Sequence, residues 1–356
     1  MDIIYSVCLY NGVIVVTTKE LCFVLAGKNG TSGDETEACQ AAKEILSEYM
    51  TVKSDRLGNV IGICGNGKIN ILLDAHIDRV GLVVRGIDDG GFLLVDKVGG
   101  EDVRIMTGAK VTVFGKETMT GVVCSTPPHL LTKAQKEAGV DISKMAIDIG
   151  CSKEDAEQLV EIGDRAIIHG EQLEMLGDRI ASPAFDDRCG VASIIKAVED
   201  VHDKIKNVRL IVQFTSQEEV GGSGAVVGAY NAETDYAIAV DVGFGDCPSC
   251  KKADTIDLGK GPSIGISPVL DRTLSRQIKD IAKKNGIPFQ HDVMSGATGT
   301  NADKINIARG GVKTALLSIP LRNMHTPVEV IDICDVDNTA RLIAEFILEK
   351  DGETDA

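Results

Sequence analysis

The spacing of apolar residues along the chain predicts a protein in which strands alternate with helices. Four runs rich in Val, Ile and Leu have the composition of buried parallel strands, at residues 69–76, 208–214, 236–241 and 312–320. Apolar residues also recur on one helical face at Val191, Ile194, Ile195, Val198 and Val201, at Leu274, Ile278 and Ile281, and at Val336, Ala340, Ile343 and Ile347. The pattern predicts an α/β fold with a sheet covered by helices on both faces.

Residues 80–180 show a different pattern. Short valine-rich runs such as GFLLVDKVGG, AKVTVFG and MTGVVCS are separated by glycines, and the one convincing helix is SKEDAEQLV, with Ser152 and Asp155 as its capping box. We therefore expect a small β-rich domain at 80–180, inserted into a catalytic domain formed by 1–79 and 181–356.

Composition restricts the class of protein and its partners. The chain has 356 residues, 44% of them hydrophobic and 25% charged, which is enough for one large or two ordinary soluble domains. Its net charge of −16 disfavours binding to nucleic acid or to an anionic membrane surface. No apolar run approaches the ~18 residues of a membrane helix. The N-terminal segment lacks the basic region of a signal peptide. We therefore expect a cytoplasmic protein.

The ten cysteines are scattered, which favours buried thiols in a reducing compartment over a disulfide framework. The exception is the CPSC sequence, which places Cys247 close to Cys250. A single C-x-x-C without a second pair is weak evidence for a zinc site, so a structural role is the favoured interpretation.

Polar residues follow each of the four predicted strands where the strand ends. In open α/β sheets, functional groups collect beyond the carboxyl ends of the strands, so we expect these side chains at one edge of the sheet. They are His76 and Asp78 after the first strand, Glu218 and Glu219 after the second, Asp241 at the end of the third, and His325 after the fourth.

Asp186 and Asp187 add two carboxylates at the start of a predicted helix. Alone, this pair would favour N-capping. Beside the other groups it favours a metal site, because converging imidazoles and carboxylates are the ligands of zinc and similar divalent ions. The number of ligands predicts two ions, bridged by a carboxylate and holding a hydroxide that attacks a polarised carbonyl.

The adjacent glutamates Glu218 and Glu219 can have separate roles. One would bind metal, and the other would carry the proton from the attacking water to a leaving amine. Adjacent side chains on an extended backbone point to opposite sides, so we expect the two carboxylates to face apart.

With these residues identified, the chain resembles the tetrahedral (TET) aminopeptidase family of dinuclear zinc metallopeptidases, which includes proteins labelled glutamyl aminopeptidase and "endoglucanase". The resemblance covers nearly the whole chain and rests on DAHIDRVGLVV, SPAFDDRCG, SQEEVGGSGA and LRNMHTPVEVI, which occur in the family's order. It implies a zinc-exopeptidase-like three-layer sandwich with a central mixed sheet. It also implies an inserted β-barrel or PDZ-like domain used in assembly, and a hollow tetrahedral dodecamer.

The resemblance also implies roles for individual residues. His76 and Asp241 would hold one metal ion, Glu219 and His325 the other, with Asp186 as the bridge. Glu218 would be the general base and acid, and Asp78 would orient the His76 ring. The peptide bond between Asp186 and Asp187 would be cis. Each subunit would bind two divalent ions, zinc first, with cobalt and manganese as alternatives.

Three residues depart from the family pattern: Arg79, Asn301 and Asn323. None replaces an expected ligand, so they bear on substrate preference rather than on the reaction.

We therefore predict a metal-dependent aminopeptidase that removes N-terminal residues from peptides. A related amidohydrolase, such as a carboxypeptidase or deacylase, stays open because Arg188 and Arg322 could bind a substrate carboxylate. An inactive metal-binding assembly scaffold is a further alternative, although it would have no use for Glu218. A cellulase is disfavoured, because the chain has no tryptophan and only 4% aromatic residues.

Overall fold

The computed structural model describes residues 8–10, 13–137 and 141–353, and its centre is a mixed eight-stranded sheet. The strand order is β17 (Gln290–Val293), β16 (Ser263–Ile266), β18 (Lys313–Leu321), β15 (Tyr236–Phe244), β5 (Ile69–His76), β14 (Val208–Thr215), β4 (Val60–Cys64) and β3 (Thr51–Ser54). The four strands predicted from the sequence are the four in the middle. They are mutually parallel, as predicted, so their carboxyl ends share one edge.

The outer strands make the sheet mixed. On one side, β4 runs antiparallel to β14 and β3 antiparallel to β4. On the other, β16 runs antiparallel to β18, while β17 is parallel to β16. The central mixed sheet implied by the family resemblance is thus confirmed.

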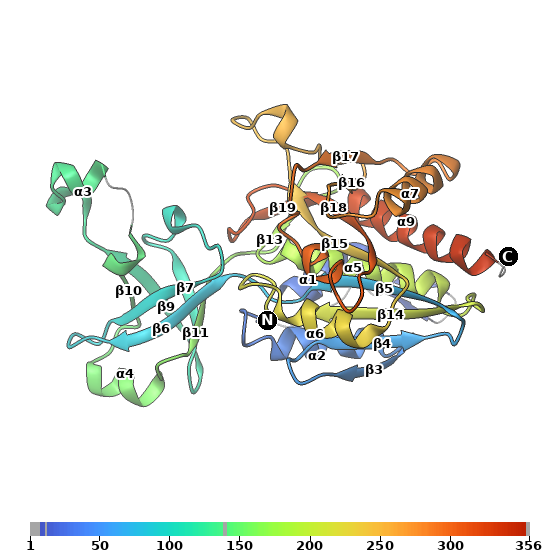
Figure 1. The fold of residues 1–356 in the computed structure, drawn as a ribbon. Coiled ribbons are helices and arrows are strands. Elements are labelled where there is room, and N and C mark those ends of the chain that lie inside the picture. The colour runs from blue at the N-terminus through green and yellow to red at the C-terminus, as the bar shows by residue number, and fades with distance from the viewer. Residues whose placement is uncertain (1–7, 11–12, 138–140, 354–356) are drawn as a thin grey trace.

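Helices cover both faces of this sheet and give three layers (Figure 1). The side chains of β5 alternate: Ile71 and Leu73 pack into one core, and Leu72 into the other. The helices of the first core are α1 (Thr18–Ala26), α2 (Thr36–Leu46), α5 (Phe185–Val201), α7 (Arg272–Lys284) and α9 (Ile333–Gly352). Those of the second are α6 (Ser223–Ala232) and α8 (Ala302–Ile305). The predicted apolar stripes of α5, α7 and α9 are buried in the first core.

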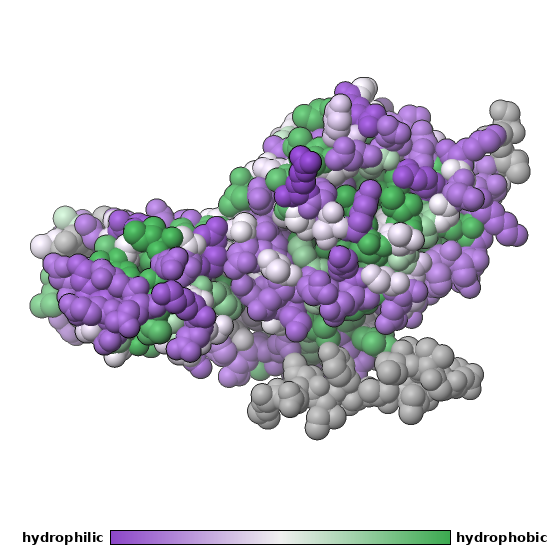
Figure 2. Space-filling view, turned by 90° about the horizontal axis from the view of Figure 1, so that it is seen from below, coloured by the Kyte–Doolittle hydropathy of each residue, from purple (hydrophilic) through white to green (hydrophobic). Residues whose placement is uncertain are grey.

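A closed six-stranded barrel stands beside the sandwich (Figure 1). Its strands, in barrel order, are β10 (Met145–Asp148), β7 (Leu93–Val98), β6 (Gly81–Ile87), β11 (Arg165–Ile168), β8 (Lys110–Phe114) and β9 (Thr118–Ser125). It has its own apolar core, separate from those of the sandwich. Figure 2 shows it projecting as a lobe with a largely hydrophilic surface on that face.

Two short helices accompany the barrel. The predicted helix is α4 (Lys153–Leu159), where the Ser152 side chain caps the backbone N–H of Asp155. In a full capping box, the Asp155 side chain would also accept the backbone N–H of Ser152. Here the Asp155 carboxylate accepts the Ser152 hydroxyl instead. The sequence did not predict α3 (Lys133–Glu137).

The remaining elements are small. A three-stranded sheet contains β12 (Leu173–Glu174), β13 (Arg179–Ser182) and β19 (Glu329–Asp332), and β1 (Cys8–Tyr10) pairs with β2 (Val13–Val15). The 3-10 helices are η1 (Val103–Ile105), η2 (Pro128–Leu130), η3 (Ile142–Lys144) and η4 (Lys252–Asp254). Over the described residues, no helix is both long and apolar enough to cross a membrane.

Candidate metal centre

His76 is the last residue of the central strand β5, and only 2% of it is exposed. Its Nε2 lies 3.0 Å from Oδ1 of Asp186 and 3.9 Å from Oδ1 of Asp241, which is on the neighbouring strand β15. The parallel register of the sheet thus brings together groups that are far apart in the sequence.

His325 comes from the loop between β18 and β19, where its backbone is left-handed with φ of 60°. Its Nε2 lies 3.2 Å from Oε1 of Glu219 and 3.3 Å from Oδ2 of Asp186. The two carboxylate oxygens of Asp186 therefore face different histidines. The structure brings together all five residues that the sequence analysis named as metal ligands.

Asp186 and Asp187 lie in the first turn of α5 with non-helical backbone angles, and the peptide bond between them is cis, as the resemblance predicts. Asp187 accepts the backbone N–H of Gly190 through Oδ1, so it caps the helix. Its Oδ2 is buried without a hydrogen-bond partner among the described residues. Ligand atoms of Asp187, His76 and Asp241 lie within 4.8 Å of one another, which makes Asp187 an additional candidate ligand.

The two glutamates do not lie on an extended backbone. The prediction that an extended backbone makes their side chains face apart is therefore wrong in its premise. Glu218 and Glu219 lie in a turn after β14, and both backbone N–H groups donate to the Asp78 carboxylate, at 2.9 and 3.2 Å. The Ser32 hydroxyl donates to the same carboxylate at 2.6 Å. Asp78 therefore positions the glutamate turn, because it accepts two backbone N–H groups from that turn.

Asp78 also contacts His76, but mainly through its backbone. The Nδ1 atom of His76 lies 3.1 Å from the Asp78 carbonyl oxygen and 3.5 Å from its carboxylate. A carbonyl can only accept, so this contact selects the tautomer with a proton on Nδ1 and leaves Nε2 facing Asp186.

The carboxylates are crowded in a buried setting. Burial, together with neighbouring acidic groups, raises the pKa of Asp187 and of Asp241 well above the usual range. Burial, followed by Glu219 and Asp78, raises the pKa of Glu218 to about 7. Hydrogen bonds to Asp186 and Glu219 outweigh burial and raise the pKa of His325 to about 11. The cluster holds more carboxylates than histidines, and an N/O donor set of this kind fits divalent cations.

Glu329 on β19 supports the cluster and was missed in the sequence analysis. It is 2% exposed, and its two carboxylate oxygens accept the backbone N–H groups of Asp186 and His325, at 3.1 and 2.9 Å. Burial, followed by the nearby Asp186 charge, raises its pKa to about 8. The available signal was an acidic residue inside the apolar run PVEVI.

The three departures from the family pattern lie close to the cluster. Arg79 is buried and electrostatically coupled to Glu101, Glu329 and Glu219. Asn301 is buried and donates to the Thr215 hydroxyl at the end of β14. Asn323 has a left-handed backbone and donates to the Val328 carbonyl within the loop that carries His325.

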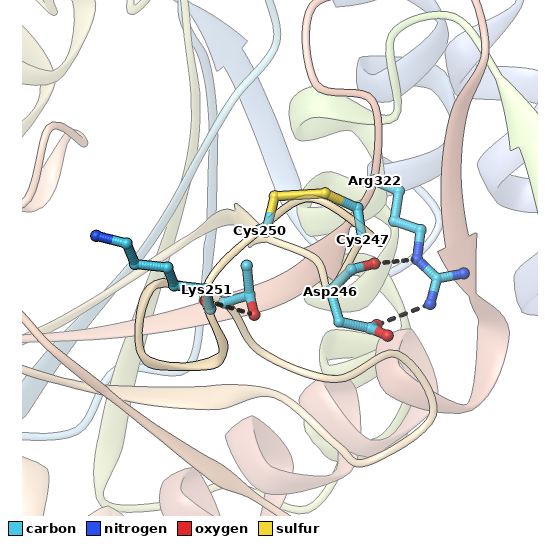
Figure 3. Close-up of a disulfide and its surroundings, with 6 residues drawn as sticks. Asp246, Cys247, Cys250, Lys251 and Arg322 are labelled. Carbon is cyan, nitrogen blue, oxygen red and sulfur yellow. Dashed lines mark hydrogen bonds and ion pairs between the residues drawn. A yellow bond between two sulfur atoms is a disulfide. The ribbon is translucent and has the colours of Figure 1, made fainter.

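Cys247 and Cys250, the pair that the sequence set apart from the other cysteines, form a disulfide (Figure 3). The sequence left their pairing open because the two lie in a loop, whose path brings their Cα atoms to 5.4 Å. The adjacent Asp246 binds the Arg322 guanidinium through its backbone oxygen and its carboxylate. Other described cysteines, such as Cys22 and Cys189, are free and buried, as expected.

A three-layer sandwich with an attached barrel, and with histidines and carboxylates beyond the strand ends, defines the chain as an exopeptidase of the TET aminopeptidase type. The chain belongs to the M42 glutamyl aminopeptidase family, whose profile matches residues 58–342. It is therefore a peptide hydrolase.

Individual relatives agree with this family. The lysyl aminopeptidase of Pyrococcus furiosus is 35% identical over 312 residues, covering 86% of this chain and 88% of its own. An aminopeptidase of the archaeon Desulfurococcus kamchatkensis has a similar structure, with a TM-score of 0.87, 34% identity, and 93% and 94% of the two chains covered. The TET1 peptidase of Pyrococcus horikoshii, which can assemble into a tetrahedron or a large octahedral shell, has a TM-score of 0.82 and 33% identity, with coverage of 93% and 99%.

Proposed function

We propose that this aminopeptidase works with two divalent metal ions bridged by Asp186. The observation that carries the proposal is the position of the Asp186 carboxylate, whose Oδ1 faces Nε2 of His76 and whose Oδ2 faces Nε2 of His325. Two half-sites follow. His76 and Asp241 would hold one ion, and Glu219 and His325 the other.

The donor set fits such ions. It combines imidazole nitrogen with carboxylate oxygen, which suits zinc, cobalt and manganese, and zinc is our first choice. The buried Oδ2 of Asp187, which has no partner in the described part of the chain, is a further sign that positive charge belongs here.

Bound at these positions, the ions would polarise the scissile carbonyl and acidify an attacking water. Glu218 is held through its backbone N–H by Asp78, which leaves its carboxylate available. We assign it the proton transfer: it takes a proton from the water and delivers it to the leaving amine.

The substrate is a peptide with a free N-terminus. A carboxypeptidase or deacylase would need an accessible cation for the substrate carboxylate. Arg188 is fully buried and donates to the Leu25 carbonyl, and Arg322 is paired with Asp246. Neither arginine is poised for that role, which favours the aminopeptidase over the related amidohydrolases.

The test compares hydrolysis of aminoacyl anilides and of N-blocked peptides by the metal-stripped protein, before and after addition of Zn, Co or Mn. We expect two bound ions per chain and cleavage confined to free N-termini. Equal cleavage of blocked peptides would favour the amidohydrolase, and two bound ions without any cleavage would favour the assembly scaffold.

We also propose that residues 80–180 form an inserted assembly domain, that 1–79 and 181–356 form the catalytic domain, and that twelve chains build a tetrahedral shell. The separate barrel core and the tetrahedron of the TET1 peptidase support this proposal. We propose a reducing, cytoplasmic location from the free cysteines, to which the Cys247–Cys250 disulfide is an exception. Light scattering coupled to size exclusion would measure the assembly, and a monomer would contradict the shell.

A further inference from the structure

The loop between β7 and η1 reaches from the barrel to the metal centre. A Cβ atom added to Gly99 would lie 3.2 Å from Cβ of Glu219. A Cβ atom added to Gly100 would lie 2.6 Å from Nδ1 and 2.8 Å from Cε1 of His325. The loop backbone therefore packs directly against two of the candidate ligands, and no side chain fits at Gly100 without moving the His325 ring.

Gly100 also makes a directional contact with that ring. Its carbonyl oxygen lies 3.2 Å from Nδ1 of His325. Because a carbonyl only accepts, the contact selects the tautomer with a proton on Nδ1 and leaves the Nε2 lone pair facing Glu219 and Asp186. The Asp78 carbonyl does the same for His76, at 3.1 Å.

The next residue in the loop is a buried acid. Glu101 is only 3% exposed, and it lies in the electrostatic field of Arg79, which directly follows Asp78 in the chain. Burial nevertheless raises the pKa of Glu101 to about 7. One Glu101 oxygen is buried without a hydrogen-bond partner among the described residues.

We propose that Gly100 is a positioning residue for the His325 half of the metal centre, so that the barrel completes the site as well as standing beside it. The inference rests on the proposed function, since it assumes that His325 binds a metal ion. Partners that orient metal-binding histidines typically change metal affinity by about 10- to 100-fold when altered.

The test is Gly100→Ala. The backbone there lies outside the left-handed region, and the three atoms nearest to the added methyl group all belong to the His325 ring. The matched control is Gly86→Ala in the same barrel, where the new Cβ would meet only Leu94, at 3.8 Å. Metal-free protein is titrated with Co²⁺ and followed by calorimetry and by absorption. We expect wild type and control to bind two ions, and Gly100→Ala to bind one ion normally and the other about 10- to 100-fold more weakly.

Two further measurements keep the inference separate from the proposed function. Glu101→Gln, which keeps the side-chain shape, should weaken the same ion by less than about 10-fold, and it replaces Gly100→Ala if that variant does not fold. Crystal structures of metal-free wild type and Gly100→Ala should show a displaced His325 ring in the variant.

The outcomes are distinct. Two equally tight ions in Gly100→Ala would overturn the inference and leave the proposed function standing. A wild type that binds fewer than two ions would overturn the two-metal proposal. In that case an unmoved His325 ring in Gly100→Ala would also overturn the inference, and a displaced ring would support it.

Discussion

The two histidines of the candidate metal centre are held by the fold in different ways. His76 ends a central strand, is almost fully buried, and contacts the carbonyl of a residue two positions later. His325 lies in a loop with a left-handed backbone, its side chain is 26% exposed, and its partner Gly100 is 225 positions away. One half of the site thus follows from the sheet. The other half depends on contact between the His325 loop, the Gly100 loop of the barrel and the turn that carries Glu219. It should therefore be the more sensitive to substitution.

The largest effect is expected on kcat, from a change at the proton-transfer residue that both halves of the site share. Glu218→Gln removes the proton acceptor but keeps the backbone N–H that Asp78 holds. We expect kcat to fall by about 10²- to 10⁴-fold, while both ions stay bound. The measurements are turnover of an aminoacyl anilide and metal content by elemental analysis. The control is Glu157→Gln, an exposed position on α4; near-normal turnover in Glu218→Gln would remove this residue from the mechanism.

Glu329→Gln should break the His325 half. An amide has one acceptor oxygen, so one of the two N–H groups that Glu329 now binds would lose its partner. We expect the ion at His325 to bind about 10- to 100-fold less tightly and the free energy of unfolding to drop by about 1 to 3 kcal/mol. Co²⁺ titration and denaturant unfolding measure these, with exposed Glu171→Gln as control. Unchanged values for both would mean that Glu329 does not support the site.

Asp78→Asn should disturb the glutamate turn more than His76, because the carbonyl that holds His76 remains in place. The amide keeps only one of the carboxylate oxygens that bind the glutamate turn. We expect turnover to fall, while the ion at His76 weakens by less than about 10-fold, below the usual range for such partners. Titration with Co²⁺ measures this. A loss of the His76 ion altogether would show that the carboxylate, and not the carbonyl, orients the ring.

The smallest effect is expected outside the site, for Arg322→Gln. The ion pair with Asp246 is partly exposed, with 25% and 40% of the two side chains accessible, so its contribution should not exceed about 1 kcal/mol. The midpoint temperature of unfolding and KM should change little. The control is Arg309→Gln, which removes one partner of a different exposed ion pair. A large rise in KM would instead indicate that Arg322 binds a substrate carboxylate and would revive the amidohydrolase alternative.

Much of the fold could be predicted because its signals are local. The central strands are continuous apolar runs, and β5 has the predicted bounds, while β15 extends three residues beyond its predicted end. Four of the candidate ligands were found because they stand at or after the predicted end of such a strand, and Asp186 was found at the start of a helix. The short α3 escaped prediction since its few residues carry no apolar periodicity.

The parts of the site that were missed depend on where distant segments meet. Glu329 looked like an ordinary strand residue until its carboxylate was placed between two backbone N–H groups. The turn at Glu218 and Glu219 was predicted as extended, because nothing local shows that both N–H groups are drawn to Asp78. The Cys247–Cys250 disulfide likewise depends on the loop path.

By itself, the sequence determined which segments form the parallel strands and which polar residues stand at their ends, since period and composition are read within a few residues. Only the tertiary structure decided how the histidines are oriented. A hydrogen bond between Gly100 and His325 requires the barrel to lie against the sheet edge, and that docking arises from contacts between segments that no local pattern encodes.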